Sequence, residues 1–568
     1  MEHRTSELNS KRQNVLCMVV LFSACFLVGL FCCELNRQFY RHHHPFYDSL
    51  SYNEKMFRVM TISRESGFAA SLETACFTNN TNCLPFLVGA AIAPLISPSR
   101  LVGVWIQTGL LYLFLVSLLF YLIRIRNLKP ATALAGCLAF LTVKCLFFSN
   151  GGLSDFRMDL SLYLGFGMTC LWYLATMARP TVTNALLLGV SAAIVCLFRA
   201  TAPIYLLFSL APLAVIEVLA HDQRRKKLIG LTLATVTVII LSGWFFVINF
   251  EFLKFYYVDW NTDANAKIPF VDALRHWKLA QRSVGEATTL LILSCVIGIM
   301  LLTRRHESVS KWISRAWSNR EIDWRIGWLA LSPVVLMVAR RAGLNPFVCM
   351  PAVFGLVLFF VLPCLSQIDR LASKSLNRFC CVMLLACLSI AIARGWKRHS
   401  RVGFDTRNAQ NQLIDTMLED SLGRNVSGFS FGVVHLTDLN SNSLYSTLLF
   451  DRVDATPKLT SVEIKGLEIK RIATFSQPAA ENWRILPGET NAEKIAHMVS
   501  DANARIDYLI LPDQRCTEEL QTTAAHNFIN RFLVPIRQQI VNDDSWTVVG
   551  KPIATNDVES VEIFRKVR

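Results

Sequence analysis

Charged residues are scarce in this chain of 568 residues. They make up 17% of the sequence, whereas hydrophobic residues make up 53% and the mean hydropathy is +0.38. Soluble domains carry more charge, and apolar runs of about 20 residues are what the core of a bilayer requires. The composition therefore excludes an ordinary soluble protein and predicts a polytopic membrane protein.

The chain also lacks internal repeats, low-complexity tracts and any C-x-x-C pair with a second pair at zinc spacing. Most of the 17 cysteines lie in apolar runs and are small core hydrophobes. Cys76 and Cys83 differ, because they fall in a polar stretch after the first run, where they form either a disulfide or two unpaired thiols. The triplet His42-His43-His44 could hold a metal, although solvated histidines are the commoner case at a membrane boundary.

The formal net charge of +15 suggests a nucleic-acid partner only at first sight. From Gly395 to the C-terminus the chain has 20 Lys and Arg against 22 Asp and Glu, so the excess belongs to the apolar part. Basic loops on the cytoplasmic side of membrane helices explain such an excess. We therefore expect no nucleic-acid partner.

Eleven apolar runs predict about eleven membrane helices. If the N-terminus is cytoplasmic, the most basic connections all lie on the cytoplasmic side, which predicts an N-in, C-out topology. The first run has no small-residue cleavage site after it and is interpreted as a retained anchor. The runs are 14–33, 101–123, 131–148, 160–178, 181–198, 200–216, 228–250, 287–303, 326–339, 345–366 and 379–393.

This topology predicts a transmembrane domain over 1–394, with a first outside loop at 34–100, and an extracytoplasmic domain over 395–568. The run Leu84 to Ser97 is short and interrupted by prolines, and we interpret it as an interfacial or re-entrant helix. Helical and strand-like patterns alternate in the tail, which predicts a small α/β domain. The patterns are Asn408 to Asp420, Gly428 to His435, Glu493 to Asp501, Asp507 to Leu511, Trp546 to Val549 and Val561 to Phe564.

Charged residues at the outer ends of the predicted helices are candidates for a site. Asp48, Asp155 and Asp159 are carboxylates at that face, where a charge is costly unless it is paired or functional. Arg199 and the pair Arg340-Arg341 add guanidiniums, which suit a phosphate group. Each carboxylate taken alone could be a solvated loop residue, and Arg199 could be a charge that reaches out of its helix to water.

The order of these features resembles that of GT-C type glycosyltransferases, which take a sugar from a polyprenyl-phosphate carrier and include protein O-mannosyltransferases and the lipid A aminoarabinose transferase. The segment Asp48-Ser-Leu-Ser-Tyr52 is similar to the first-loop segment of that family, in which an Asp precedes a Tyr by four residues. Further similar segments, in chain order, are Leu84 to Leu87, Arg100 to Gly103, Phe156 to Tyr163, Cys196 to Pro203 and Asn345 to Pro351. The resemblance covers roughly residues 10 to 395.

The chain departs from the family pattern in three places. Ser49 follows Asp48 where a second acidic residue is common, and the Lys-Pro-Pro-Leu motif is reduced to Cys83-Leu84-Pro85-Phe86. The Arg-Tyr that often precedes the late proline helix is missing. The sugar, the acceptor and the length of the lipid carrier therefore stay open.

The resemblance implies that Asp48 is the catalytic carboxylate, supported by Tyr52. Arg199 with Arg340 or Arg341 would bind the donor phosphate, while Asp155 or Asp159 would position the acceptor or hold a divalent cation. The implied partners are a polyprenyl-phosphate-linked sugar, a lipid, glycan or protein acceptor, and membrane lipids. A transporter or lipid flippase and a non-catalytic scaffold or sensor are the alternatives from other classes.

Overall fold

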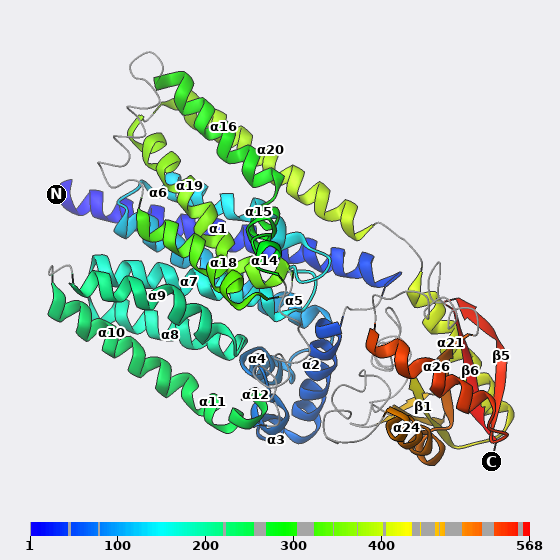
Figure 1. Ribbon diagram of the computed structural model, residues 1–568. Coiled ribbons are helices and arrows are strands. Elements are labelled where there is room, and N and C mark those ends of the chain that lie inside the picture. The colour runs from blue at the N-terminus through cyan, green and yellow to red at the C-terminus, as the bar shows by residue number, and fades with distance from the viewer. Residues whose placement is uncertain are drawn as a thin grey trace. The chain divides into compact units, whose positions relative to one another are not determined.

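The computed structural model divides the chain into two compact units (Figure 1). The first comprises Met1–Asn36 and Lys55–His399, and the second comprises Arg37–Glu54 and Ser400–Arg568. The structure describes residues 2–43, 47–77, 80–219, 223–254, 269–303, 323–342, 344, 346–371, 373–400, 405–433, 444, 461–464, 466–471, 491–513, 527–554 and 560–567.

The first unit is built of helices. Long helices run beside one another, and the short helices α3, α4 and α12 gather near one end of them (Figure 1). The elements in chain order are α1 (Glu2–Tyr40), α2 (Tyr47–Ser66), α3 (Phe68–Leu72), η1 (Glu73–Phe77), α4 (Leu84–Ile92), α5 (Leu101–Phe120), η2 (Tyr121–Ile125), α6 (Pro130–Ala139), η3 (Phe140–Thr142), η4 (Lys144–Phe147), α7 (Met158–Ala178), α8 (Val182–Phe198), α9 (Ala202–Leu219), α10 (Arg224–Val238), η5 (Ile239–Gly243), α11 (Trp244–Ile248), α12 (Phe250–Lys254), α14 (Phe270–Ala273), α15 (His276–Val284), α16 (Glu286–Thr303), α18 (Trp324–Arg340), η7 (Pro346–Cys349), α19 (Met350–Leu371) and α20 (Lys374–His399).

Each of the eleven predicted apolar runs lies on helical structure, but not every one passes as a membrane span. Within the described residues, 7 helices are long and apolar enough to cross a membrane, or 8 if the bent pair Phe270–Val284 and Glu286–Leu301 is one span. The two members of that pair meet at 77°. Pro130–Thr142 and Val182–Phe198 are shorter apolar helices. The polytopic helical fold is confirmed, whereas the number eleven is not.

Close packing between helices holds the first unit together. Residues Met158 to Met177 of α7 are all buried, so this helix lies in the middle of the unit. Gly355 of α19 lies against α18, where an added Cβ would be 2.3 Å from the backbone nitrogen of Ala330. Only glycine permits so close an approach of two backbones. Helices α18 and α19 therefore form a rigid pair.

The predicted orientation can be tested with reporter fusions. A reporter inserted after Lys227, in the basic segment at the start of α10, is expected to report the cytoplasm, because positive residues are retained on that side. A reporter at the C-terminal end is expected to report the opposite side. A cytoplasmic signal from the C-terminal fusion would contradict the orientation and the outside placement of every candidate carboxylate.

The second unit contains a mixed six-stranded sheet in the order β2-β3-β1-β4-β6-β5. Strand β1 pairs in parallel with both β3 and β4, whereas β2, β5 and β6 join by antiparallel pairing. The described elements are α21 (Thr406–Gly423), β1 (Gly428–Val433), β2 (Ser461–Ile464), β3 (Leu467–Arg471), α24 (Asn491–Arg505), β4 (Tyr508–Pro512), α26 (Asn527–Val541), β5 (Trp546–Ala554) and β6 (Ser560–Lys566).

The two faces of this sheet bind different helices because successive strand residues point to opposite sides. Leu509 and Leu511 of β4 pack with α24 and α26 in one apolar cluster. Tyr508 of β4 faces α21, where its hydroxyl bonds to Asp420 and lies 2.8 Å from the hydroxyl of Ser421. The α/β character of the tail is therefore confirmed, and strands β2 and β3 and helix α26 are additions to the sequence-based pattern.

Candidate active site

Three charged side chains meet at the start of α7. Asp159 lies in the first turn of this helix and is 5% exposed. Arg157 donates from Nε to one carboxylate oxygen at 2.7 Å, and the guanidinium of Arg199 lies 3.2 Å from the other oxygen. Two guanidiniums on one carboxylate leave an excess positive charge, so this cluster is suited to hold an anion.

The position of Arg157 is fixed from several sides. Its backbone carbonyl accepts a hydrogen bond from Gln107 of α5 at 2.7 Å, and its guanidinium donates to Asn150 at 3.1 Å. The guanidinium also stacks on the ring of Phe347, 4.1 Å from the centroid. Gly151 has φ +82°, and a Cβ there would approach Phe347 to 2.5 Å, so the loop requires glycine. These contacts preorganise the guanidinium.

Arg199 is the residue that follows α8, and its side chain is 15% exposed in the ion pair with Asp159. It is therefore a partly buried cation that is paired with Asp159. Helix α9 begins three residues later and carries Tyr205, whose hydroxyl donates to the carbonyl of Val348 at 2.9 Å. Tyr205 is in electrostatic contact with Asp159, Arg199 and Arg340, which places Arg340 near the cluster.

Asp155 has a structural task. It is 1% exposed and accepts a hydrogen bond from the backbone N–H of Gly151 at 2.6 Å, which closes the turn before α7. Arg340 is exposed in the last turn of α18, and Arg341 follows it in the left-handed conformation with φ 51°. The structure thus brings Asp159 and Arg199 into contact, while Asp155 belongs to the loop that supports them.

A second cationic centre lies at Lys55 of α2. Its ammonium group donates to the side-chain oxygen of Asn80 and lies 4.3 Å above the ring of Phe86. Cys76 and Cys83 are its electrostatic neighbours. Burial lowers the pKa of Lys55 to about 7, so the side chain is close to half protonated at neutral pH.

Backbone hydrogen bonds join this centre to the segment that carries Arg199. The N–H of Cys83 donates to the carbonyl of Leu197 at 2.9 Å, and the N–H of Ala200 donates to the carbonyl of Thr81 at 3.0 Å. Asn249, which is 2% exposed, accepts from the N–H of Asn80 at 3.0 Å. The segment that carries Arg199 is therefore held beside the loop that contacts Lys55 through Asn80.

An apolar groove of about 480 Å³ begins beside these segments. Helices α4, α5 and α8 form its walls, and Leu84 and Phe198 at its edge directly adjoin Cys83 and Arg199 in the chain. Other residues that line it are Val88, Ile92, Trp105, Ile106, Gly109, Leu110, Tyr112, Leu113 and Ile194. The groove is therefore apolar along its walls and adjoins the segment that carries Arg199 and the loop that contacts Lys55.

Asp48 and Tyr52 lie at the start of α2, in the part of the chain that belongs to the second unit. The segment before them is attached to the start of α21: the carbonyl of His42 accepts from Thr406 at 3.2 Å, and Nδ1 of His42 lies 2.9 Å from Asp405. Burial raises the pKa of Asp405, but the hydrogen bonds with His42 and the backbone of Asn408, together with the charges of His42 and His43, outweigh it, so that the pKa is lowered. The tail thus anchors the segment that leads to Asp48.

Several contributors have only a weak signal in the sequence. Arg157 stands two residues before Asp159 within a segment that resembles the family, and this spacing could have identified it. Lys55 stands seven residues after Asp48. The sequence around it does not show that Asn80 and Phe86, which come later in the chain, contact it. Among the residues that the structure describes, no group of three His, Cys, Asp or Glu side chains could hold a metal ion.

The fold and the site define the class of multi-pass helical membrane proteins, here with paired charges near an apolar groove. The chain is similar in structure to ArnT from Cupriavidus metallidurans. The apo crystal structure matches with a TM-score of 0.55 and 12% identity, and the structure bound to undecaprenyl phosphate matches with 0.52 and 13%. Both matches cover 96% of this chain and 97% of ArnT, so the GT-C-like fold predicted from the sequence is confirmed. No protein-family model and no curated protein matches the sequence.

Proposed function

We propose that this protein is an integral-membrane glycosyltransferase that moves a sugar from a polyprenyl-phosphate donor to an acceptor on the extracytoplasmic face. The observation that carries the proposal is the apolar groove that adjoins the segment of Arg199 and the loop that contacts Lys55, in a chain whose fold matches ArnT over nearly its whole length. A polyprenyl phosphate has the same two parts, a long apolar tail and an anionic head. The acceptor is a lipid, a glycan or a protein.

In this mechanism the donor tail occupies the groove and the phosphate lies against the cations. Arg199 binds the phosphate with the planar fork of its guanidinium. Arg157 holds Asp159, so that Asp159 keeps Arg199 oriented. Arg340 or Arg341 adds a further positive charge. Lys55 supplies an ammonium group on the neighbouring segment. These charges stabilise the phosphate as the bond between the anomeric carbon and its oxygen breaks.

Asp48 is proposed as the general base, with Tyr52 in support. It takes the proton from the acceptor hydroxyl while the acceptor oxygen bonds to the anomeric carbon and the polyprenyl phosphate leaves. Both carboxylate oxygens of Asp159 contact guanidiniums. We therefore propose that Asp159 orients Arg199, in place of the role in acceptor or cation binding that the sequence led us to expect.

A transfer assay tests the function. Purified protein is incubated with a panel of labelled polyprenyl-phosphate sugars and a membrane extract as acceptor, and the label is expected to leave the donor for an acceptor that depends on the protein. Movement of intact labelled donor across the bilayer of proteoliposomes, without transfer, would instead identify a flippase. Neither transfer nor movement with any donor would contradict both functions.

A larger side chain in the groove is expected to weaken donor binding. A Cβ at Gly109 meets no atom within 4 Å, so Gly109→Leu fills the groove without a clash and removes room for the tail. We expect the KM for a long-chain donor to rise roughly tenfold, the cost of displacing about two methylene groups, with little change in kcat at saturation.

The matched control is Gly243→Leu. This glycine also lies in a membrane helix, where an added Cβ meets Ile239 at an ordinary 3.5 Å, and it does not line the groove. Both substitutions improve helix propensity, so neither should lower the melting temperature. Equal effects of the two variants on KM would remove the groove from donor binding.

A further inference from the structure

The thiols of Cys76 and Cys83 form a pair beside Lys55. Both residues are buried, at 1% and 0% exposed, and both are free in this structure. Their side chains are in hydrogen-bond contact with each other. Cys76 lies in η1, and Cys83 directly precedes α4. The two cysteines therefore stand at the two ends of the connection between these elements.

The surroundings favour a thiolate at Cys76. The hydrogen bond from Cys83 lowers the pKa of Cys76 against the effect of burial, and the ammonium group of Lys55 lowers it further. A thiolate attacks a disulfide, whereas a thiol does not. Hydrogen bonds already hold both ends of the connection, because the carbonyl of Cys76 accepts from Asn249 at 2.9 Å and the N–H of Cys83 donates to Leu197 at 2.9 Å.

We propose that Cys76 and Cys83 form a disulfide in the mature protein, which fixes the segment that presents Asn80 to Lys55. The Cys76 thiolate attacks the disulfide of an oxidant, a thiol–disulfide oxidoreductase or a small disulfide, and releases one thiol. Cys83 then loses its proton and attacks the Cys76 sulfur, which releases the second thiol. One S–S bond forms, and the oxidant is reduced by two electrons and takes up two protons.

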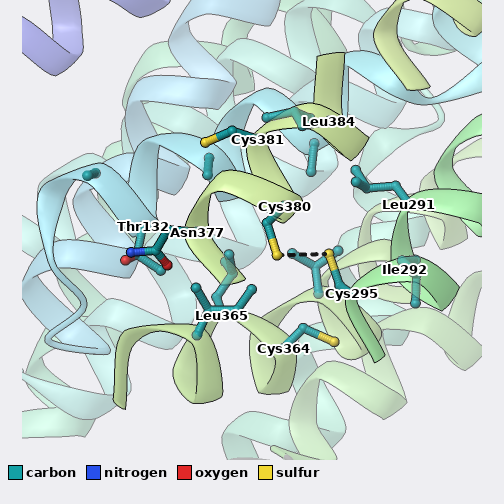
Figure 2. Close-up of a pocket in the computed structure, with 15 residues that line it drawn as sticks. Thr132, Leu291, Ile292, Cys295, Cys364, Leu365, Asn377, Cys380, Cys381 and Leu384 are labelled. Carbon is teal, nitrogen blue, oxygen red and sulfur yellow. Dashed lines mark hydrogen bonds between the residues drawn. The ribbon is translucent and has the colours of Figure 1, made fainter. Parts of the chain in front are cut away.

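A second close pair of cysteines serves as an internal control. Cys295 of α16 and Cys380 of α20 lie 4.0 Å apart, sulfur to sulfur, beside an apolar cavity of about 160 Å³ (Figure 2). Cys364 also lines this cavity, and the other labelled neighbours are mostly apolar (Figure 2). This pair lies within membrane helices, and no lysine lines its cavity among the described residues, so we expect it to stay reduced although its sulfurs are in contact.

The test alkylates the denatured full-length protein before and after reduction. Without reductant, the fragment that contains Cys76 and Cys83 is expected to take no label and to be about 2 Da lighter than its reduced form, the mass of two hydrogens. Cys295 and Cys380 are expected to take label at once. Labelling of both Cys76 and Cys83 in the first step overturns the proposal, and protection of both pairs shows unspecific oxidation and overturns it too.

Stability in detergent gives an independent measurement. Reductant is expected to lower the melting temperature of the wild-type protein and to leave that of the Cys76→Ser, Cys83→Ser double variant unchanged. After reduction, re-formation of the bond is expected to be slower in Lys55→Gln, because the thiolate has lost its cation. Equal responses of the wild type and the double variant to reductant would contradict a bond at this place. The result does not depend on the transfer reaction, so the two proposals can fail separately.

Discussion

Replacing Asp48 with asparagine is expected to lower the turnover number by about two to four orders of magnitude, because the amide keeps the shape of the side chain but cannot take a proton. Membrane insertion and melting temperature should stay unchanged, since Asp48 lies in the first turn of α2 and asparagine is tolerated there. The measurement is single-turnover transfer with saturating donor, so that a change in binding is not mistaken for a change in chemistry.

Asp272→Asn is the matched control for this variant. Asp272 is a carboxylate in the first turn of α14, its side chain is 36% exposed and it pairs with Arg275, 3.3 Å away. The same chemical change there should leave transfer within twofold of the wild type, as roughly expected for a surface pair. Near-normal transfer by Asp48→Asn would remove Asp48 from the mechanism.

Changes at Arg199 are expected to affect donor binding strongly. Arg199→Gln should raise the KM for the donor by about tenfold to a hundredfold, since a hydrogen-bonded charge on the phosphate is lost. Arg199→Lys keeps the charge but loses the planar fork, so an intermediate value is expected. Both variants also disturb the pair with Asp159, and their melting temperatures should fall.

Asp159→Asn separates phosphate binding from a purely structural role. It breaks the same ion pair from the other side and leaves two guanidiniums uncompensated at a side chain that is 7% exposed, which should cost about 3 kcal/mol of stability. Donor KM, however, should rise less than in Arg199→Gln, because Arg199 keeps its charge and loses only the carboxylate that orients it. If Asp159→Asn and Arg199→Gln raised the KM equally, Arg199 would be a packing residue only.

The sequence predicts the fold well where a segment has a long apolar run or a regular alternation of apolar and polar residues. All eleven apolar runs are helical, and the strands beginning at Gly428, Tyr508 and Trp546 follow alternating or continuous apolar residues. The number of spans is harder, because α6 and α8 are shorter than a bilayer requires and α15 meets α16 at a sharp bend. Length and hydropathy cannot show such bends. Strands β2 and β3 are only 4 and 5 residues long, so their alternation of apolar and polar residues is too short to give a clear signal.

The sequence indicates part of the charged cluster. Asp159 at the start of α7 and Arg199 at the end of α8 were expected on one face, because the end of one span lies on the same side as the start of the span before it, and the structure pairs them. The partners of Asp155 could not be predicted, since its bond to Gly151 depends on a left-handed glycine in a loop. Lys55 was missed because its burial comes from Asn80 and Phe86, and only the folded chain brings these to α2.

Helix α2 is continuous from Tyr47 to Ser66 and carries both Asp48 and Lys55. Seven residues are close to two turns, so the two positions start from one side of the helix, about 10 Å apart along its axis. One inserted residue between them would turn one position by about 100° relative to the other, whereas a deletion of a whole turn would keep the side and shorten the interval by about 6 Å. The helix therefore sets the phase and spacing of Lys55 and the proposed base, and insertions or deletions between them should be less well tolerated than substitutions.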